Sequence, residues 1–296
     1  MTEPTRRPTP YVGVSGITTE AEASAILAMW PATAPPRSLM LGVLTSAKVL
    51  QGGARNARSA APADFRRIFQ PDRRVLNLVH YFTTTQDTLE LDLLRCLRTP
   101  ACDGAQINVA WPSPEALSTV RLQSPAWTRL VLQVGPKMLA DFHRSIVAEL
   151  VDREYRGIAT DVLIDVSAGK GLALDPKRAR EMVEAMAAWN LDISIGIAGG
   201  LCAETLPAFA PLLRWREVEF GTCDRCHNEP CVGGRTDAEI AVAQLDDGWI
   251  CERCHARWIG PVSIDAEGRL RNHRDELDLD KVRAYLEVAA RIMGWA

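Results

Sequence analysis

Two pairs of cysteines are the clearest group of residues with a chemical role. Each pair has two intervening residues and 24 residues separate the pairs, so four thiolates could bind one tetrahedral Zn²⁺. The predicted ligands are Cys223, Cys226, Cys251 and Cys254. Three nearby donors could each replace one of them: His227, Cys231 and His255. Four protein ligands leave no open coordination position, so the predicted cofactor is a structural Zn²⁺.

A second stretch, DVLIDVSAGKG (161–171), carries groups that could transfer a proton or hold an anion. Asp165 and Ser167 are two residues apart, so a strand would point both side chains the same way. A carboxyl group at the edge of an apolar core can serve as a general acid or base. In the loop that follows, Gly169 would let backbone N–H groups approach a phosphate and Lys170 would add charge. The alternative is an aspartate that caps a turn before a flexible loop.

A glycine pair, Gly199 and Gly200, follows the apolar run DISIGIA (192–198). Backbone N–H groups at the corresponding loop of α/β barrels commonly bind phosphate, so the pair is a candidate phosphate site. The alternative is a tight turn that needs positive φ angles.

The elements that must position these residues alternate between strand and helix. Nearly continuous apolar runs predict strands buried on both faces of a parallel sheet, at 11–17, 39–45, 75–81, 105–110, 129–135, 161–167 and 192–198. Helical periodicity follows at 18–30, 87–98, 141–152, 175–189, 202–215 and 278–292. Seven strand–helix units and a closing helix predict an α/β fold, the (β/α)8 TIM barrel, rather than an open sheet.

The eighth strand has two candidates. EVEF (217–220) is preferred because its distance from the seventh strand fits one helix, and PVSID (261–265) is the alternative. The first choice places the cysteine-rich segment at the catalytic rim of the barrel, and the second starts it from the opposite rim. The expected organisation is a disordered lead-in (1–10) and a barrel (11–296), interrupted by a small zinc-ribbon-like insert (221–258) near strand eight.

Polar residues stand at the ends of the expected strands, where barrels of this kind carry their chemistry. Besides the residues named above, they are Ser15, Lys48, His80, Gln106, Asn108, Gln133 and Lys137. Three of these strand-end residues, Lys48, Lys137 and Lys170, are lysines, although only five of the 34 basic residues are lysine. The predicted catalytic residues are Asp165, Ser15 and Lys170. The other strand-end residues are predicted to bind substrate or phosphate, except Gln133, which has no assigned role.

Four motifs in order resemble the phosphoribosylanthranilate isomerase family over roughly 11–220. They are YVGVSGITTEAEA (11–23), AQINV (105–109), DVLIDVSAGKG and IAGGL (197–201). The resemblance implies a TIM barrel that performs an Amadori rearrangement, with a strand-one cysteine as base, a strand-six aspartate as acid and glycines of the last two loops on the phosphate. Asp165 matches the acid, and Gly199 and Gly200 match the phosphate site. Ser15 replaces the cysteine and Asn108 the family's strand-four histidine, which implies a different reaction or substrate.

The overall composition argues against a nucleic-acid-binding protein and a membrane-spanning protein. A net charge of −3 gives no general attraction to nucleic acid, and no run of 18 apolar residues predicts a membrane span. The N-terminal segment lacks the apolar core of a secretory signal, so a cytoplasmic location and no membrane partner are expected. The oligomeric state is not predicted.

The leading hypothesis is an enzyme that acts on a phosphorylated sugar-like or nucleotide-like small molecule by acid–base chemistry, with isomerisation as the first expectation. A Schiff-base lyase that uses Lys170 is a second hypothesis. A third is a non-catalytic barrel whose zinc ribbon binds nucleic acid or a protein partner. The predominance of acidic residues between the two cysteine pairs disfavours nucleic acid as the partner.

Overall fold

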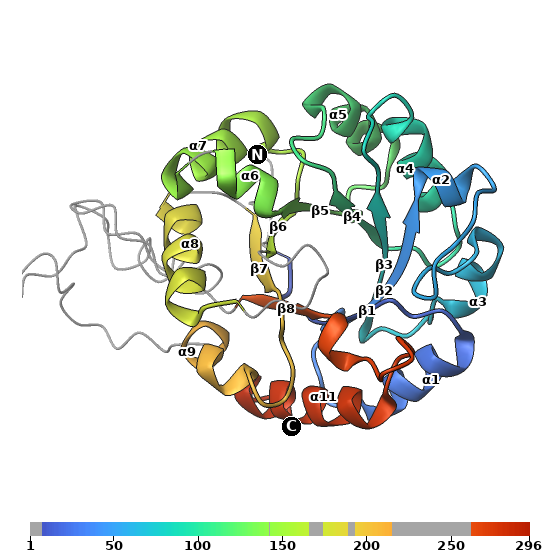
Figure 1. Cartoon of the computed structure of the whole chain (residues 1–296), viewed down its shortest axis with the longest axis vertical. Coiled ribbons are helices and arrows are strands. Elements are labelled where there is room, and N and C mark those ends of the chain that lie inside the picture. Colours follow the sequence, from blue (N-terminus) through green and yellow to red (C-terminus); the bar gives the residue numbers. More distant parts are fainter. Residues whose placement is uncertain (1–7, 142, 166–173, 189–192, 215–261) are drawn as a thin grey trace, which may run out of the picture.

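Eight parallel strands close into a barrel, and helices surround it (Figure 1). The structure is a computed structural model that describes residues 8–141, 143–165, 174–188, 193–214 and 262–296. The strands are β1 (Val12–Ser15), β2 (Leu39–Ser46), β3 (Val75–Phe82), β4 (Gly104–Asn108), β5 (Arg129–Val134), β6 (Asp161–Asp165), β7 (Ser194–Ala198) and β8 (Ser263–Ala266). Each strand pairs with the next, and β8 pairs with β1, which confirms the predicted (β/α)8 fold.

Helices follow most of the strands. The α-helices are α1 (Glu20–Met29), α2 (Ala47–Leu50), α3 (Phe65–Ile68), α4 (Leu89–Leu97), α5 (Pro114–Gln123), α6 (Pro136–Asp141), α7 (Arg144–Tyr155), α8 (Pro176–Ala188), α9 (Ala210–Leu213) and α11 (Leu279–Met293). The 3-10 helices are η1 (Pro62–Asp64), η2 (Leu206–Phe209) and η3 (Gly268–Leu270). None of the described helices is long and apolar enough to span a membrane.

Local signals explain most helix boundaries. The hydroxyl of Thr19 accepts from the backbone N–H of Glu22, whose carboxylate accepts from the backbone N–H of Thr19, so α1 begins with a capping box. The segment 202–215 is not one long helix but the short η2 and α9, because prolines interrupt it. Helix α5 is missing from the predicted helices, although Ser113 caps it and Pro114 occupies its first turn.

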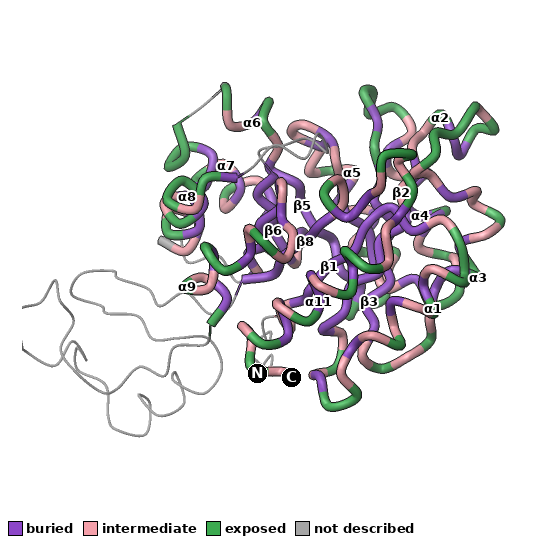
Figure 2. Tube along the Cα trace, turned by 60° about the horizontal axis from the view of Figure 1, so that its bottom comes forward, coloured by how far each residue is buried: buried purple, intermediate pink, exposed green. Residues whose placement is uncertain are grey.

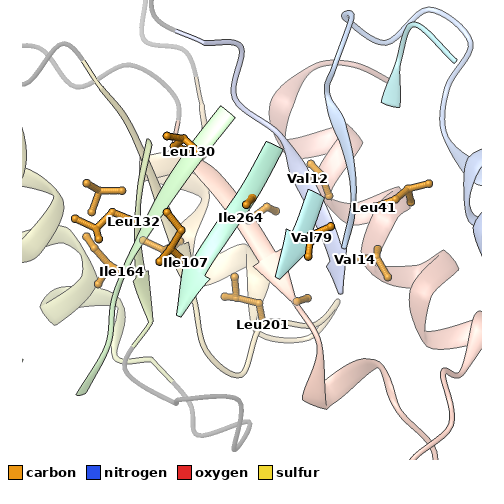
Figure 3. Packing of buried hydrophobic residues seen from close by; sticks show 14 of the residues in the cluster. Val12, Val14, Leu41, Val79, Ile107, Leu130, Leu132, Ile164, Leu201 and Ile264 are labelled. Carbon is orange, nitrogen blue, oxygen red and sulfur yellow. The ribbon is translucent and has the colours of Figure 1, made fainter. Parts of the chain in front are cut away.

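The hydrophobic core has two parts, because successive side chains of a strand point to opposite faces. Outward-facing residues such as Val14, Val79 and Ile264 pack between the barrel and the helices (Figure 3). A smaller cluster fills the inside of the barrel: Tyr11, Met40, Leu76, Leu78, Val131, Leu163 and Ala198. Figure 2 shows the strands as mostly buried residues inside helices that mix buried, intermediate and exposed residues, as the nearly continuous apolar runs predict.

A buried ion pair lies inside the barrel near the starts of the strands. Arg129 at the start of β5 binds Asp161 at the start of β6 through both Nε and Nη2, and both side chains are at least nine-tenths buried. Of the predicted lead-in, residues 8–10 are described. The backbone carbonyls of Pro8 and Thr9 accept hydrogen bonds from Ser194 and Arg129, so these residues pack on the barrel.

The preferred position of strand eight is wrong, because β8 is Ser263–Ala266, within the alternative PVSID stretch and its next residue. Barrel closure decides this, since β8 pairs with both β7 and β1 and completes the ring of strands. The segment 215–261, which contains 217–220 and the predicted zinc insert, lies outside the described residues. The described residues on either side of it meet at the rim where the strands begin, because Val262 N donates to Leu212 O over 3.2 Å.

A substitution at Gly104, at the start of β4, tests how closely the backbones of β4 and β5 approach each other. A Cβ atom there would lie 2.0 Å from the backbone oxygen of Arg129, and backbone cannot move aside cheaply. We expect Gly104→Ala to lower the free energy of unfolding by about 2–3 kcal/mol, because β4 and β5 would have to separate. Urea unfolding measures this change.

Gly135, with nothing within 4 Å of its added Cβ, provides the matched control. Gly135→Ala should change stability by about 0.5 kcal/mol or less. Equal effects of the two substitutions would contradict the close approach at Gly104.

Candidate active site

The side chains inside the barrel change from apolar to polar toward the carboxyl ends of the strands. Toward the carboxyl ends of their strands, the inward positions carry Ser15, His80, Gln106, Gln133, Asp165 and Asp265. All six side chains are more than nine-tenths buried. Because every strand is parallel, the six polar groups meet at one end of the barrel, the end where catalytic groups of such barrels reside.

Asp165 is oriented by a chain of two amides. Gln133 Nε2 donates to Asp165 Oδ2 over 2.7 Å, and Gln106 Nε2 donates to Gln133 Oε1 over 3.1 Å. Because the Gln133 amide nitrogen donates to Asp165, its carbonyl oxygen is left to accept from Gln106. In this arrangement Gln106 Oε1 is buried without a hydrogen-bond partner among the described residues, so it could accept a hydrogen bond from a ligand.

A second polar group joins β1, β3 and β8. The Ser15 hydroxyl donates to Asp265 Oδ1 over 2.6 Å, and His80 Nδ1 lies 4.0 Å from Asp265 Oδ2. An added Cβ at Gly42 would lie 2.7 Å from His80 Nε2 and 2.9 Å from Ser15 Oγ. The missing side chain at Gly42 therefore lets these two groups approach each other, and His80 Nε2 has no partner in the described part of the chain.

Burial keeps both Asp265 and His80 uncharged near pH 7. Desolvation raises the pKa of Asp265 to about 8, the Ser15 hydrogen bond opposes this rise, and the negative charges of Glu267 and Asp165 add to it. Burial lowers the pKa of His80 to about 3. The 4.0 Å contact is consequently a contact between two neutral groups, and we do not regard it as an ion pair.

The glycine pair after β7 forms a turn beside Asp165. Asp165 is the register partner of Ala198, and Gly199 and Gly200 follow directly with φ angles of 114° and 63°. Among the described residues, none accepts a hydrogen bond from the backbone N–H groups of Gly200 or Leu201. Adjacent free N–H groups in a turn with left-handed residues form an anion-binding concavity.

The loop after β8 is tied to the loops after β1 and β2. Arg271 Nη2 donates to the backbone oxygen of Gly16 over 2.7 Å, and Arg58 binds Glu267 and Asp275 at 2.9 and 2.8 Å. Gly16 has a φ of 80°, and a Cβ there would lie 2.0 Å from Arg271 Nη2. These contacts fix the wall of the site next to Ser15 and Asp265.

The structure brings together five of the predicted site residues at this end of the barrel. They are Ser15, His80, Gln106, Asp165 and Gly199. Gly200 is next to them and Asn108 ends β4, half-buried. Lys48 on α2 and Lys137 on α6 are exposed at the same rim of the barrel. Ser167, Gly169 and Lys170 lie outside the described residues.

Asp265 is the site residue that sequence reasoning missed. The signal was present, since PVSID and DVLID both end in Ile-Asp. With 217–220 as strand eight, Asp265 does not end a predicted strand, and no role is predicted for it.

The predicted zinc ligands Cys223, Cys226, Cys251 and Cys254 also lie outside the described residues. Within the described ranges, no three or more His, Cys, Asp or Glu side chains are grouped so that they could hold a metal ion. The structural Zn²⁺ therefore stays a prediction.

Comparison with solved structures finds the same fold at low sequence identity. Phosphoribosyl anthranilate isomerase from Thermus thermophilus has a TM-score of 0.54 and 17% identity, covering 95% of this chain and 99% of that chain. Mutually generated monomers of the dimeric phosphoribosylanthranilate isomerase from Thermotoga maritima have a TM-score of 0.54 and 13% identity, covering 95% and 98%. No protein-family model and no curated protein matches the sequence. The likeness establishes the fold alone.

The raised pKa of Asp265 makes stability depend on pH. The folded protein keeps a proton on Asp265 up to a pH of about 8, whereas the unfolded chain releases it near the ordinary pKa of 3.8. The free energy of unfolding should therefore fall as pH rises between these values, by up to about 1.4 kcal/mol per pH unit from this group. Asp265→Asn should remove that part of the slope.

Urea unfolding of both proteins at pH 5, 6, 7 and 8 measures the difference between the slopes. Parallel pH dependence of wild type and Asp265→Asn would show that Asp265 is ionised in the folded protein.

Proposed function

We propose that the protein is an enzyme that acts by acid–base chemistry on a phosphorylated sugar-like or nucleotide-like small molecule, most simply as an isomerase. One observation carries this proposal: Asp165 is buried at the carboxyl end of the barrel strands, oriented by Gln133, and adjacent to the glycine turn. A proton-transferring carboxylate therefore lies beside a concavity suited to a phosphate group.

The chemistry of an isomerisation fits the polar layer. One hydrogen of the substrate must leave a carbon and another must be added to a neighbouring atom, so one group takes a proton and one gives it. Asp165 would serve as one of these groups. His80 Nε2 and Gln106 Oε1 are buried without partners in the described structure, and they would bind hydroxyl or amino groups of the substrate.

The similar solved structures agree with this class of reaction, since both are phosphoribosylanthranilate isomerases. At 17% and 13% identity they support the fold and leave the substrate open. Ser15 and Asn108 stand where the family pattern has cysteine and histidine, which supports a reaction that differs in its proton-transfer groups. We also propose that the four cysteines at 223, 226, 251 and 254 bind a structural Zn²⁺, which metal analysis of the purified protein would test.

Asp165→Asn tests the catalytic role. The amide keeps the shape of the side chain but cannot take or give the proton, so we expect kcat to fall by about 100-fold or more. The assay would use phosphoribosyl anthranilate together with phosphorylated aldoses and aminoaldoses. Asp152→Asn, in a surface pair on α7, is the control and should keep full activity. Turnover by Asp165→Asn at the wild-type rate would exclude this role.

Gly200→Ala tests the phosphate site. The φ of 63° is unfavourable for alanine, so the turn should open and inorganic phosphate should bind about tenfold more weakly. The backbone amide signals of Gly200 and Leu201, followed by NMR during a phosphate titration, measure the binding. Gly157→Ala, at a φ of 75° after α7, controls for backbone strain and should leave the affinity unchanged. Phosphate that leaves both amide signals in place would argue against the site.

A further inference from the structure

Ser15 and Asp265 are joined by a short hydrogen bond within the polar layer. They are 250 positions apart in sequence, yet Ser15 Oγ and Asp265 Oδ1 are separated by 2.6 Å, and both side chains are buried. A serine hydroxyl alone exchanges protons poorly at neutral pH, but a carboxyl partner can supply or remove its proton. The Ser15 hydroxyl on β1 therefore has a titratable partner, the Asp265 carboxyl group on β8.

The surroundings of Asp265 isolate it from water. An added Cβ at Gly13 would lie 2.9 Å from Asp265 Oδ1, so the carboxyl group rests directly against the backbone of β1. Among the described residues, the titratable groups that interact with it are Tyr11 just before β1, His80 on β3, Asp165 on β6, Glu267 after β8 and Tyr285 on α11. None of these is a cation near pH 7, which favours the neutral, proton-carrying form of Asp265.

We propose that Ser15 and Asp265 form a proton-donating pair opposite Asp165, in which Asp265 stores the proton and the Ser15 hydroxyl delivers it to the substrate. The inference rests on the proposed function and adds the group that complements Asp165. Asp165 accepts a hydrogen bond from Gln133, an arrangement that suits an ionised proton acceptor, whereas Asp265 is enclosed and neutral.

The proton steps balance. The Asp165 carboxylate takes a proton from the carbon next to a C=O or C=N group of the substrate. The electron pair of that C–H bond forms a C=C bond, and the π pair moves onto the oxygen or nitrogen. That atom takes the proton of Ser15 Oγ, for which the hydroxyl turns away from Asp265 Oδ1, and Ser15 Oγ then takes the proton that the Asp265 carboxyl group carries. The negative charge has then moved from Asp165 to Asp265, and the reverse steps at the neighbouring carbon restore both groups.

The pH profile of activity provides the first test. In wild type, kcat should fall as pH rises through about 8, where Asp265 loses its proton. We expect Asp265→Asn to lower kcat by about 100-fold and Ser15→Ala by at least about tenfold, and both to lose the alkaline fall. Ser263→Ala removes another buried hydroxyl of β8, the acceptor of Tyr11 N, and should keep the wild-type profile. An unchanged rate and profile in Ser15→Ala would overturn the pair, even with Asp165→Asn inactive.

Infrared spectroscopy provides a second test that needs no substrate. The carbonyl band of a protonated carboxylic acid, assigned to Asp265 by its loss in Asp265→Asn, should persist at pH 6 and fade near pH 8. Because the Ser15 hydrogen bond lowers the pKa of Asp265, Ser15→Ala should move the midpoint to higher pH. If Asp265→Asn does not fold, the shift of the midpoint in Ser15→Ala is sufficient to assign the carbonyl band to Asp265.

The two tests separate the proposals. Absence of any isomerase activity would overturn the proposed function, whereas the infrared titration would still decide whether the two side chains share a proton. An ionised Asp265 at pH 6, or a midpoint that Ser15→Ala leaves in place, would overturn the pair.

Discussion

The alternation of side chains along eight strands that close into a barrel is the constraint on which the rest of this structure depends. Half of the residues of each strand must pack against helices and the other half must fill the barrel. The inner half is apolar in the middle, where Met40, Leu78 and Leu163 exclude water. Polar groups are consequently confined to the two ends, with the Arg129–Asp161 pair at one and the candidate active site at the other.

The two ends of the barrel use their polar groups differently. Where the strands begin, Arg129 and Asp161 satisfy each other as a charged pair, so neither of these two buried charges is unpaired. At the carboxyl ends of the strands, hydrogen bonds among glutamines and carboxyl groups leave His80 Nε2 and Gln106 Oε1 unpaired within the described structure. Buried polar atoms without partners reduce stability. A ligand that donates to or accepts from these atoms would recover that free energy.

Glycines make the candidate site compact. Gly13 and Gly42 leave room where Asp265, His80 and Ser15 meet, and Gly16 lets the guanidinium of Arg271 reach the β1 loop. The close approach has an electrostatic consequence, because a carboxyl group pressed against backbone and apolar side chains keeps its proton. Small residues in the strands thus determine the charge state of a group on a different strand.

The sequence alone determined the features that depend on local periodicity and local motifs. Short stretches of chain are enough to predict seven strands and the main helices. They also predict that Asp165 ends a strand and that a glycine turn begins at Gly199. The structure alone decided which stretch is β8, because a four-residue strand carries little local signal and is defined by pairing with both β7 and β1. The pairing of Ser15 with Asp265 follows from that closure. A contact across 250 positions depends on strand register, and register is a property of the closed barrel rather than of either segment.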